Sequence, residues 1–228
     1  MTAFALPPPE QPSVAICGSH LRFPVRRIFC VGRNYAEHAR EMGNDPDKEP
    51  PFFFTKPADA LVESGTTIPY PPMTSDLHHE AELVVAIGLA GREIPVERAL
   101  AHVWGYAAGN DLTRRDLQAE AKATRRPWDM SKGFDHSAVV GALARSVYGS
   151  PPQGRIRCLV DGVVRQDAEL ADMIWPVSSI LAYLSRLVEL RPCDLIFTGT
   201  PAGVGAIARG QTCKVEIDGL DTATVTLA

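Results

Sequence analysis

The stretch His78-His79-Glu80-Ala81-Glu82 runs directly into the apolar segment Leu83-Val84-Val85-Ala86-Ile87, and it is the most informative part of the chain. The uninterrupted, β-branched apolar run predicts a buried strand. Because successive side chains of a strand point to opposite faces, Glu80 and Glu82 would share one face, close enough to hold one cation. A second predicted strand, residues 102–110, would deliver Asp111 at its end.

These three acidic side chains are candidate metal ligands. Crowded carboxylates repel one another and protonate more easily unless a positive charge lies between them. Oxygen donors without a paired Cys ligand are typical of a hard divalent ion, Mg²⁺ or Mn²⁺. For an arbitrary Glu-x-Glu pattern, solvated charges at a strand end are the alternative, but the apolar run that follows favours burial. A zinc protease motif is excluded, because it needs His at position 83, which is Leu83.

Composition restricts the class of protein. The chain has 228 residues, of which 45% are hydrophobic and 22% are charged, enough for one large domain with a real core. A net charge of −4, without a block of Lys or Arg, argues against nucleic acid or a membrane surface as partner. No apolar run approaches the ~20 residues of a membrane span. Five scattered Cys residues and the lack of a secretory segment predict reduced thiols and a cytoplasmic location.

The remaining pattern predicts many strands and few helices. A short helix is expected from Asn34 to Gly43, and a clear amphipathic helix follows Pro176. Asp-Gly pairs at 161–162 and 218–219, between apolar flanks, predict hairpins. Since nothing alternates regularly as βαβ, the expected fold class is a strand-rich α+β fold. Residues 1–25 would form an N-terminal extension or a small strand pair, and residues 26–228 the main domain.

Several polar residues are candidates for catalysis. His38 and Glu41 lie three residues apart on the predicted short helix, so the carboxylate could orient the imidazole as a general base for water. An ordinary polar helix face is the alternative, and from the spacing alone it is favoured. Lys56, Lys132 and Arg115 are each compatible with plain surface charges when taken singly.

Taken together, the chain from about residue 28 onward resembles the fumarylacetoacetate hydrolase superfamily, and within it the bacterial fumarylpyruvate and acylpyruvate hydrolases. The resemblance depends on a series of motifs in a fixed order: Gly32-Arg33-Asn34-Tyr35 with His38 and Glu41, Phe54-Thr55-Lys56-Pro57, His79-Glu80-Ala81-Glu82, Asp111-Leu112-Thr113-Arg114-Arg115-Asp116 with Gln118, Lys132, and Thr198-Gly199-Thr200-Pro201.

The resemblance implies a rolled, mixed β-sheet with a few short helices, a homodimer, and a catalytic domain over residues 26–228. It implies Mg²⁺ or Mn²⁺ held by Glu80, Glu82 and Asp111, with a 2,4-dioxo acid as substrate. The implied catalytic residues are His38, Glu41 and Lys132. The implied substrate-binding residues are Arg33, Lys56, Arg115, Gln118, Gly199 and Thr200.

The implied reaction is hydrolysis of the C–C bond of an acylpyruvate, with fumarylpyruvate as the first candidate. The alternatives are an oxaloacetate decarboxylase or a 2-hydroxymuconate-type isomerase of the same superfamily, or a catalytically silent metal-binding module. No single residue is singled out for the distal carboxylate of a fumaryl group. Four arginines are candidates for that contact: Arg33, Arg114, Arg125 and Arg126.

Overall fold

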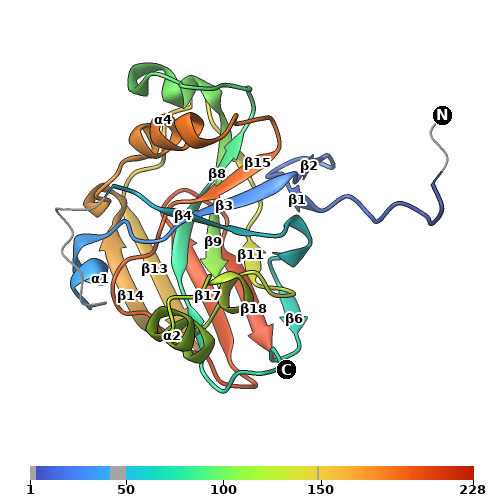
Figure 1. Ribbon diagram of the computed structural model, residues 1–228, viewed down its shortest axis with the longest axis vertical. Helices are drawn as coiled ribbons and strands as arrows, with labels where there is room; N and C mark the ends of the chain where they lie inside the picture. The colour runs from blue at the N-terminus through green and yellow to red at the C-terminus, as the bar shows by residue number, and fades with distance from the viewer. Residues whose placement is uncertain (1–3, 42–49, 148) are drawn as a thin grey trace.

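The computed structural model describes residues 4–41, 50–147 and 149–228. Two β-sheets pack against each other and form most of the molecule (Figure 1). The larger sheet is mixed and has eight strands, and the second sheet has five. The predicted strand-rich α+β fold with a rolled mixed sheet is therefore confirmed.

The strands of the larger sheet, in spatial order, are β4 (Phe53–Lys56), β3 (Arg27–Val31), β15 (Asp194–Phe197), β8 (Ala81–Ile87), β9 (Val103–Asp111), β11 (Ala138–Val140) and β5 (Leu61–Glu63), with β12 (Ala144–Arg145) also paired to β9. Those of the second sheet are β14 (Val163–Glu169), β13 (Arg155–Val160), β17 (Thr212–Ile217), β18 (Ala223–Leu227) and β6 (Thr66–Ile68). A three-stranded ribbon contains β10 (Thr113–Arg114), β7 (Leu77–His79) and β16 (Gly205–Ala206).

The helices are short and lie around the sheets. The α-helices are α1 (Ala36–Glu41), α2 (Arg115–Ala123), α3 (Asp129–Lys132) and α4 (Val177–Leu187). The 3₁₀ helices are η1 (Ala58–Ala60), η2 (Val96–His102) and η3 (Leu170–Asp172). None of the helices in these described parts of the chain is long and apolar enough to cross a lipid bilayer.

Strand β8 is buried on both faces, which explains its continuous apolar sequence. Leu83 and Val85 belong to the core between the two sheets. Val84 packs on the opposite face, in a second cluster that includes Phe197 of β15. Such a strand occupies the centre of a sheet, and β8 indeed lies between β15 and β9.

Strand directions bring five chain segments to one end of the larger sheet. Strands β3 and β15 are parallel, and both are followed by loops at this end. Strand β8 is antiparallel to β15 and to β9, so β8 begins where β15 and β9 finish. Strand β11 is antiparallel to β9 and also begins here. Loops and side chains that are distant in sequence therefore meet at this end.

The predicted local elements are largely confirmed. The helix after Pro176 is α4, and the Asp161-Gly162 pair joins β13 to β14 as a hairpin with positive φ at both residues. The Asp218-Gly219 pair lies between the antiparallel strands β17 and β18. Near the N-terminus, β1 (Ser13–Ala15) pairs with β2 (Arg22–Pro24), whereas the predicted domain boundary at residue 25 stays a prediction.

Gly109 of β9 allows β8, β9 and β15 to approach closely. A Cβ atom at this position would lie 2.4 Å from Cγ2 of Val84 and 2.9 Å from a ring carbon of Phe197. Both neighbours are completely buried and cannot move aside easily. We expect Gly109→Ala to lower the free energy of unfolding by about 1–3 kcal/mol, as measured by denaturant titration. Gly205→Ala is the control, because its Cβ would make only an ordinary 3.5 Å contact with His79; equal losses would contradict the packing argument.

Candidate metal-dependent active site

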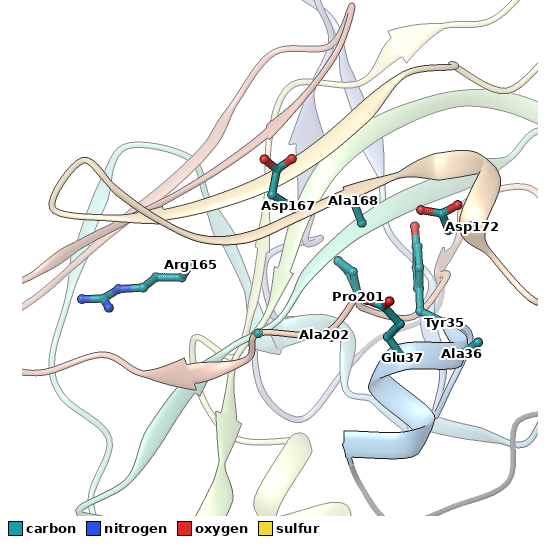
Figure 2. Close-up of a pocket in the computed structure, with 10 residues that line it drawn as sticks. Tyr35, Ala36, Glu37, Arg165, Asp167, Ala168, Asp172, Pro201 and Ala202 are labelled. Carbon is teal, nitrogen blue, oxygen red and sulfur yellow. The ribbon is translucent and has the colours of Figure 1, made fainter.

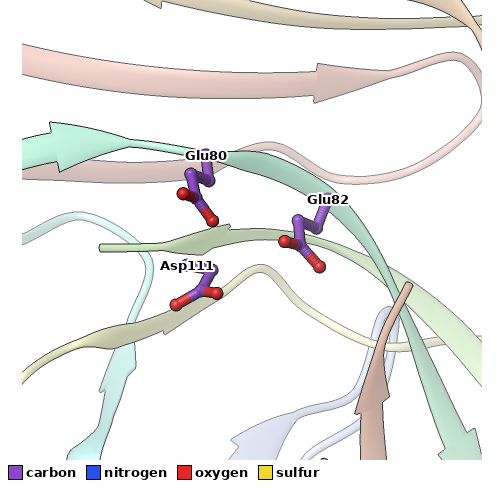
Figure 3. A group of neighbouring side chains, drawn as sticks. All are labelled: Glu80, Glu82 and Asp111. Carbon is purple, nitrogen blue, oxygen red and sulfur yellow. The ribbon is translucent and has the colours of Figure 1, made fainter. Parts of the chain in front are cut away.

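Glu80, Glu82 and Asp111 converge at the end of the larger sheet, as predicted from their positions in the sequence (Figure 3). One oxygen atom of each carboxylate lies within 4.8 Å of the others, and all three residues are buried. Glu80 stands in the break between β7 and β8, where its backbone N–H donates to the side-chain oxygen of Asn110. The backbone N–H of Asp111 in turn donates to the carbonyl of Glu80, which aligns the two strands.

Four donors surround this triad. The ammonium of Lys132 lies 2.5 Å from Oε2 of Glu80 and 2.7 Å from Oδ2 of Asp111. The ammonium of Lys56 lies 2.7 Å from Oδ1 of Asp111, and a guanidinium nitrogen of Arg115 lies 2.6 Å from Oε1 of Glu80. Glu82 differs from the other two acids, because its carboxylate accepts from a backbone group, the N–H of Gly199, which lies 2.7 Å from Oε2.

Because of this asymmetry, the pKa values of Glu80 and Glu82 shift in opposite directions. Burial alone would raise the pKa of Glu80, but Lys132 and Arg115 outweigh it and hold the pKa below its usual range. Burial, together with the neighbouring charges of Asp111 and Glu80, raises the pKa of Glu82 well above its usual value. Burial would lower the pKa of Lys132, but Asp111 and Glu80 raise it, so its ammonium stays charged.

The donor set fits a hard divalent cation. Three carboxylates bring oxygen ligands only, which Mg²⁺ and Mn²⁺ prefer, and they leave coordination positions for other oxygen atoms. The raised pKa of Glu82 indicates that the protein's own cations do not fully compensate the triad. A divalent ion held by Glu80, Glu82 and Asp111 would supply the missing charge.

A cavity of about 230 Å³ opens beside the triad, and half of the predicted site residues line it. His38 of α1 is buried and lines it together with Glu80 and Lys132. Two predicted substrate-binding residues of α2, Arg115 and Gln118, line it as well, and Arg115 donates to Oε1 of Gln118 at 2.6 Å. The remaining lining residues are Gly32, Arg33, Lys122 and Trp128.

The predicted partner of His38, Glu41, has its side chain outside the described residues. Glu41 is the last residue of α1, so it shares this helix with His38. The His38–Glu41 pair therefore stays a prediction. Gly43, predicted to end the helix, also lies outside the described residues.

Three other predicted substrate-binding residues do not line the cavity. Lys56 is buried, and its ammonium also donates to the carbonyl oxygens of Leu112 and Lys132. Gly199 has a φ of +95°, and a Cβ here would lie 2.7 Å from that of Asn34. Thr200 is buried, with its hydroxyl oxygen accepting a hydrogen bond. Their contacts hold the ligand strands, and substrate contact by them stays a prediction.

Gln166 of β14 is a positioning residue that the sequence does not reveal. Its amide oxygen accepts from Nδ1 of His79 and from the backbone N–H of Ala81, the two residues that flank Glu80. Its amide nitrogen donates to the hydroxyl of Thr200 and to the carbonyl of Pro201. One buried side chain of the second sheet thus binds both the 79–81 segment and the 200–201 segment. A single Gln in a strand gives no sequence signal of this role.

A larger cavity of about 600 Å³ lies between α1, β14 and the 201–203 loop (Figure 2). Its charged lining residues are Glu37, Arg165, Asp167 and Asp172. No member of the triad lines it, and neither do His38 and Lys132. Because the converging charges lie in the smaller cavity, the smaller cavity is the candidate active site.

Replacing Glu82 by Gln should separate metal binding from stability. It removes one metal ligand, so Mn²⁺ at a hundredfold excess over its Kd should no longer raise the free energy of unfolding by about 2.7 kcal/mol, a Tm shift of roughly 5–10 °C. The metal-free variant should equal or exceed the wild type in stability, because one repelling charge is gone. Thermal unfolding with and without Mn²⁺ measures both effects.

The same substitution should change the pH dependence of stability. A folded-state pKa raised above the unfolded value means that the metal-free wild type loses stability as the pH rises above the ordinary pKa of Glu, and Glu82→Gln should flatten this loss. The control is Glu63→Gln, an exposed acid paired with Arg22. A normal Mn²⁺ shift in Glu82→Gln would show that Glu82 is not a ligand.

Comparison with known proteins agrees with this geometry. A model of the C-terminal domain of fumarylacetoacetate (FAA) hydrolase matches residues 27–228. The solved structure of fumarylpyruvate hydrolase from Pseudomonas aeruginosa, in complex with Mn²⁺ and pyruvate, is 51% identical, covers 99% of both chains and superposes with a TM-score of 0.95.

Two curated relatives are equally similar in sequence. The fumarylpyruvate hydrolase of Ralstonia sp is 42% identical over 188 residues, which cover 82% of this chain and 98% of the relative. The mitochondrial oxaloacetate decarboxylase of Dictyostelium discoideum is 42% identical over 199 residues, covering 86% and 91%. The resemblance seen in the motifs is confirmed, and the chain belongs to the fumarylacetoacetate hydrolase family.

Proposed function

We propose that this protein is a divalent-metal-dependent acylpyruvate hydrolase that cleaves fumarylpyruvate to fumarate and pyruvate. One observation carries the proposal: a buried three-carboxylate cluster reaches a small cavity through Glu80, and a buried histidine and a buried lysine line the same cavity. The relative solved with Mn²⁺ and pyruvate supports both the ion and the product.

The divalent ion and the cationic side chains of the cavity would together compensate the negative charge of the substrate. When bound by Glu80, Glu82 and Asp111, a divalent ion supplies Lewis-acid stabilisation of the negative charge that develops on the 2-oxo acid. Arg115 and Gln118 line the same cavity as Glu80. They would bind and orient the carboxylate of the pyruvate part.

In this proposal His38 is the general base. It would take a proton from a water molecule whose oxygen then bonds to the acyl carbonyl carbon. The C–C bond to the pyruvate part breaks, and its electron pair leaves with pyruvate as the enolate. The proton held by His38 then goes to the enolate carbon at which the bond broke, which gives pyruvate. Lys132 stays protonated beside Glu80 and would donate to the developing oxyanion, a contact worth roughly 3 kcal/mol or more.

Oxaloacetate decarboxylation is the second candidate function. A relative of that activity is as similar in sequence as the Ralstonia hydrolase. The same ion and cations would stabilise an enolate in both reactions, but decarboxylation needs no attacking water. The role of His38 therefore discriminates between them. The homodimer, the cytoplasmic location and the preference for Mg²⁺ or Mn²⁺ stay predictions.

The direct test is the release of fumarate and pyruvate from fumarylpyruvate by the purified protein. We expect turnover with added Mg²⁺ or Mn²⁺ and its loss, by at least about 100-fold, after chelation, since the ion carries the developing charge. Oxaloacetate and acetylpyruvate are compared on the same metal-loaded sample. Turnover that survives the chelator, or faster turnover of oxaloacetate, would reject fumarylpyruvate hydrolysis as the main activity.

His38→Ala should abolish hydrolysis selectively. We expect kcat for fumarylpyruvate to fall by about 10²–10⁴-fold, because the general base is lost, while decarboxylation of oxaloacetate keeps most of its rate. Steady-state rates on both substrates are the measurement. His20→Ala, which removes an exposed histidine of the 18–21 loop, is the matched control. A parallel fall on both substrates would assign His38 to binding or folding rather than to water activation.

A further inference from the structure

The candidate active-site cavity carries more positive than negative charge. Four of its lining residues are cationic, namely Arg33, Arg115, Lys122 and Lys132, whereas the carboxylate that lines it is Glu80. Glu80 already pairs with Arg115 and Lys132. Lys122 therefore adds positive charge beyond these two pairs, and Arg33 lines the same cavity.

Two aromatic rings hold these two cations at the wall of the cavity. The rings of Phe52 and Trp128 pack edge to face, with centroids 5.4 Å apart. The guanidinium carbon of Arg33 lies 5.0 Å from the centroid of Phe52, and the ammonium of Lys122 lies 5.1 Å from that of Trp128. Cation–π contacts position a cation without neutralising it, so the charge of Lys122 stays available to a ligand.

Lys122 lies on the same face of α2 as the residues assigned to the pyruvate end. Arg115, Gln118 and Lys122 follow the i, i+3, i+7 spacing of one helix face, and all three line the cavity. The rise of 1.5 Å per residue separates the first and last by roughly 10 Å along the helix. A ligand with one acidic group at Arg115 would reach toward Lys122 with its other end.

The electrostatic state of Lys122 agrees with a missing anion. Partial desolvation, together with the guanidinium groups of Arg115 and Arg33, lowers the pKa of Lys122 to about 8. Across the described parts of the chain, no carboxylate lies within ion-pair distance of its ammonium. A carboxylate bound here would favour the charged ammonium and relieve the repulsion among the cations.

We propose that Lys122 and Arg33, held on the Phe52–Trp128 pair, form a second carboxylate subsite that selects 2-oxo acids with an acidic group at the far end of the acyl chain. This inference rests on the proposed function for the position of the pyruvate end. It names the substrate class of the cavity as dicarboxylates of extended length.

The other arginines considered from the sequence do not reach the cavity. Arg114 lies over the ring of Phe134, 4.3 Å from its centroid, and is absent from the cavity wall. The side chain of Arg126 is 70% exposed and lies beyond the end of α2. Arg125 follows α2 and is exposed as well. The sequence did not single out Lys122, which here has the role considered for these arginines, the contact with the distal carboxylate.

The experiment compares the binding of two unreactive acids to the Mn²⁺-loaded protein by calorimetry. 2-Oxoheptanedioate and 2-oxoheptanoate share the 2-oxo acid end and a seven-carbon chain, as long as that of fumarylpyruvate, but only the first has a distal carboxylate. We expect Lys122→Gln to weaken binding of the diacid by about tenfold or more, because a charge-assisted hydrogen bond is lost. Binding of the monoacid should change by less than about twofold.

Two variants complete the test. Lys122→Arg keeps the charge and should retain most of the affinity for the diacid. Arg126→Gln also removes one positive charge, but outside the cavity and beyond the end of α2. It should leave both affinities unchanged. Equal binding of the two acids by the wild type, or equal weakening of both by Lys122→Gln, would overturn the proposal.

The binding experiment tests the subsite and the turnover experiment tests the reaction, so either proposal can be rejected without the other. If Lys122→Gln weakens only the diacid but the wild type does not cleave fumarylpyruvate, the subsite stands and the proposed reaction is wrong. If fumarylpyruvate is cleaved but Lys122 does not discriminate between the acids, the reaction stands and the subsite is wrong.

Discussion

The crowding of three buried carboxylates at one end of a sheet is the constraint on which the rest of the structure depends. Glu80, Glu82 and Asp111 cannot all ionise in an apolar interior unless positive charge surrounds them. The protein places Lys132 and Lys56 on the acids at 2.5–2.7 Å, and it leaves Glu82 with a backbone donor. This incomplete compensation is what a candidate cation site requires, whereas a network of internal ion pairs would compensate its own charge.

The architecture serves that cluster in two ways. Antiparallel pairing of β8 and β9 sets Asp111 beside Glu80, and the close approach allowed by Gly109 keeps the strands packed under the acids. Polar residues from outside this strand pair then hold the flanking backbone. Gln166 reaches from the second sheet to both site segments, so the packing of the two sheets and the geometry of the site are coupled.

The cations of the site divide into two groups with different physical roles. Lys56 and Lys132 are buried against carboxylates, where removal of either partner would leave an uncompensated charge. Arg33 and Lys122 lie on aromatic rings at the cavity wall, and in the described parts of the chain no carboxylate lies within ion-pair distance of Lys122. The first group supports the ligand cluster, and the second faces the space that a substrate would occupy. The excess of positive charge there also attracts anionic ligands from solution.

Local patterns were sufficient to predict much of this protein. The apolar run from Leu83 to Ile87 identified the central strand, and the spacing after Pro176 identified α4. The acids beside the central strand predicted the buried carboxylate cluster, since each of these signals depends on periodicity or on a motif. The tertiary structure alone decided which polar side chains share the cavity. Gln166 comes from a strand without a motif, and Lys122 lies beyond the motif that ends at Gln118. Long-range pairing and helix docking, which a linear sequence does not display, bring them to the site.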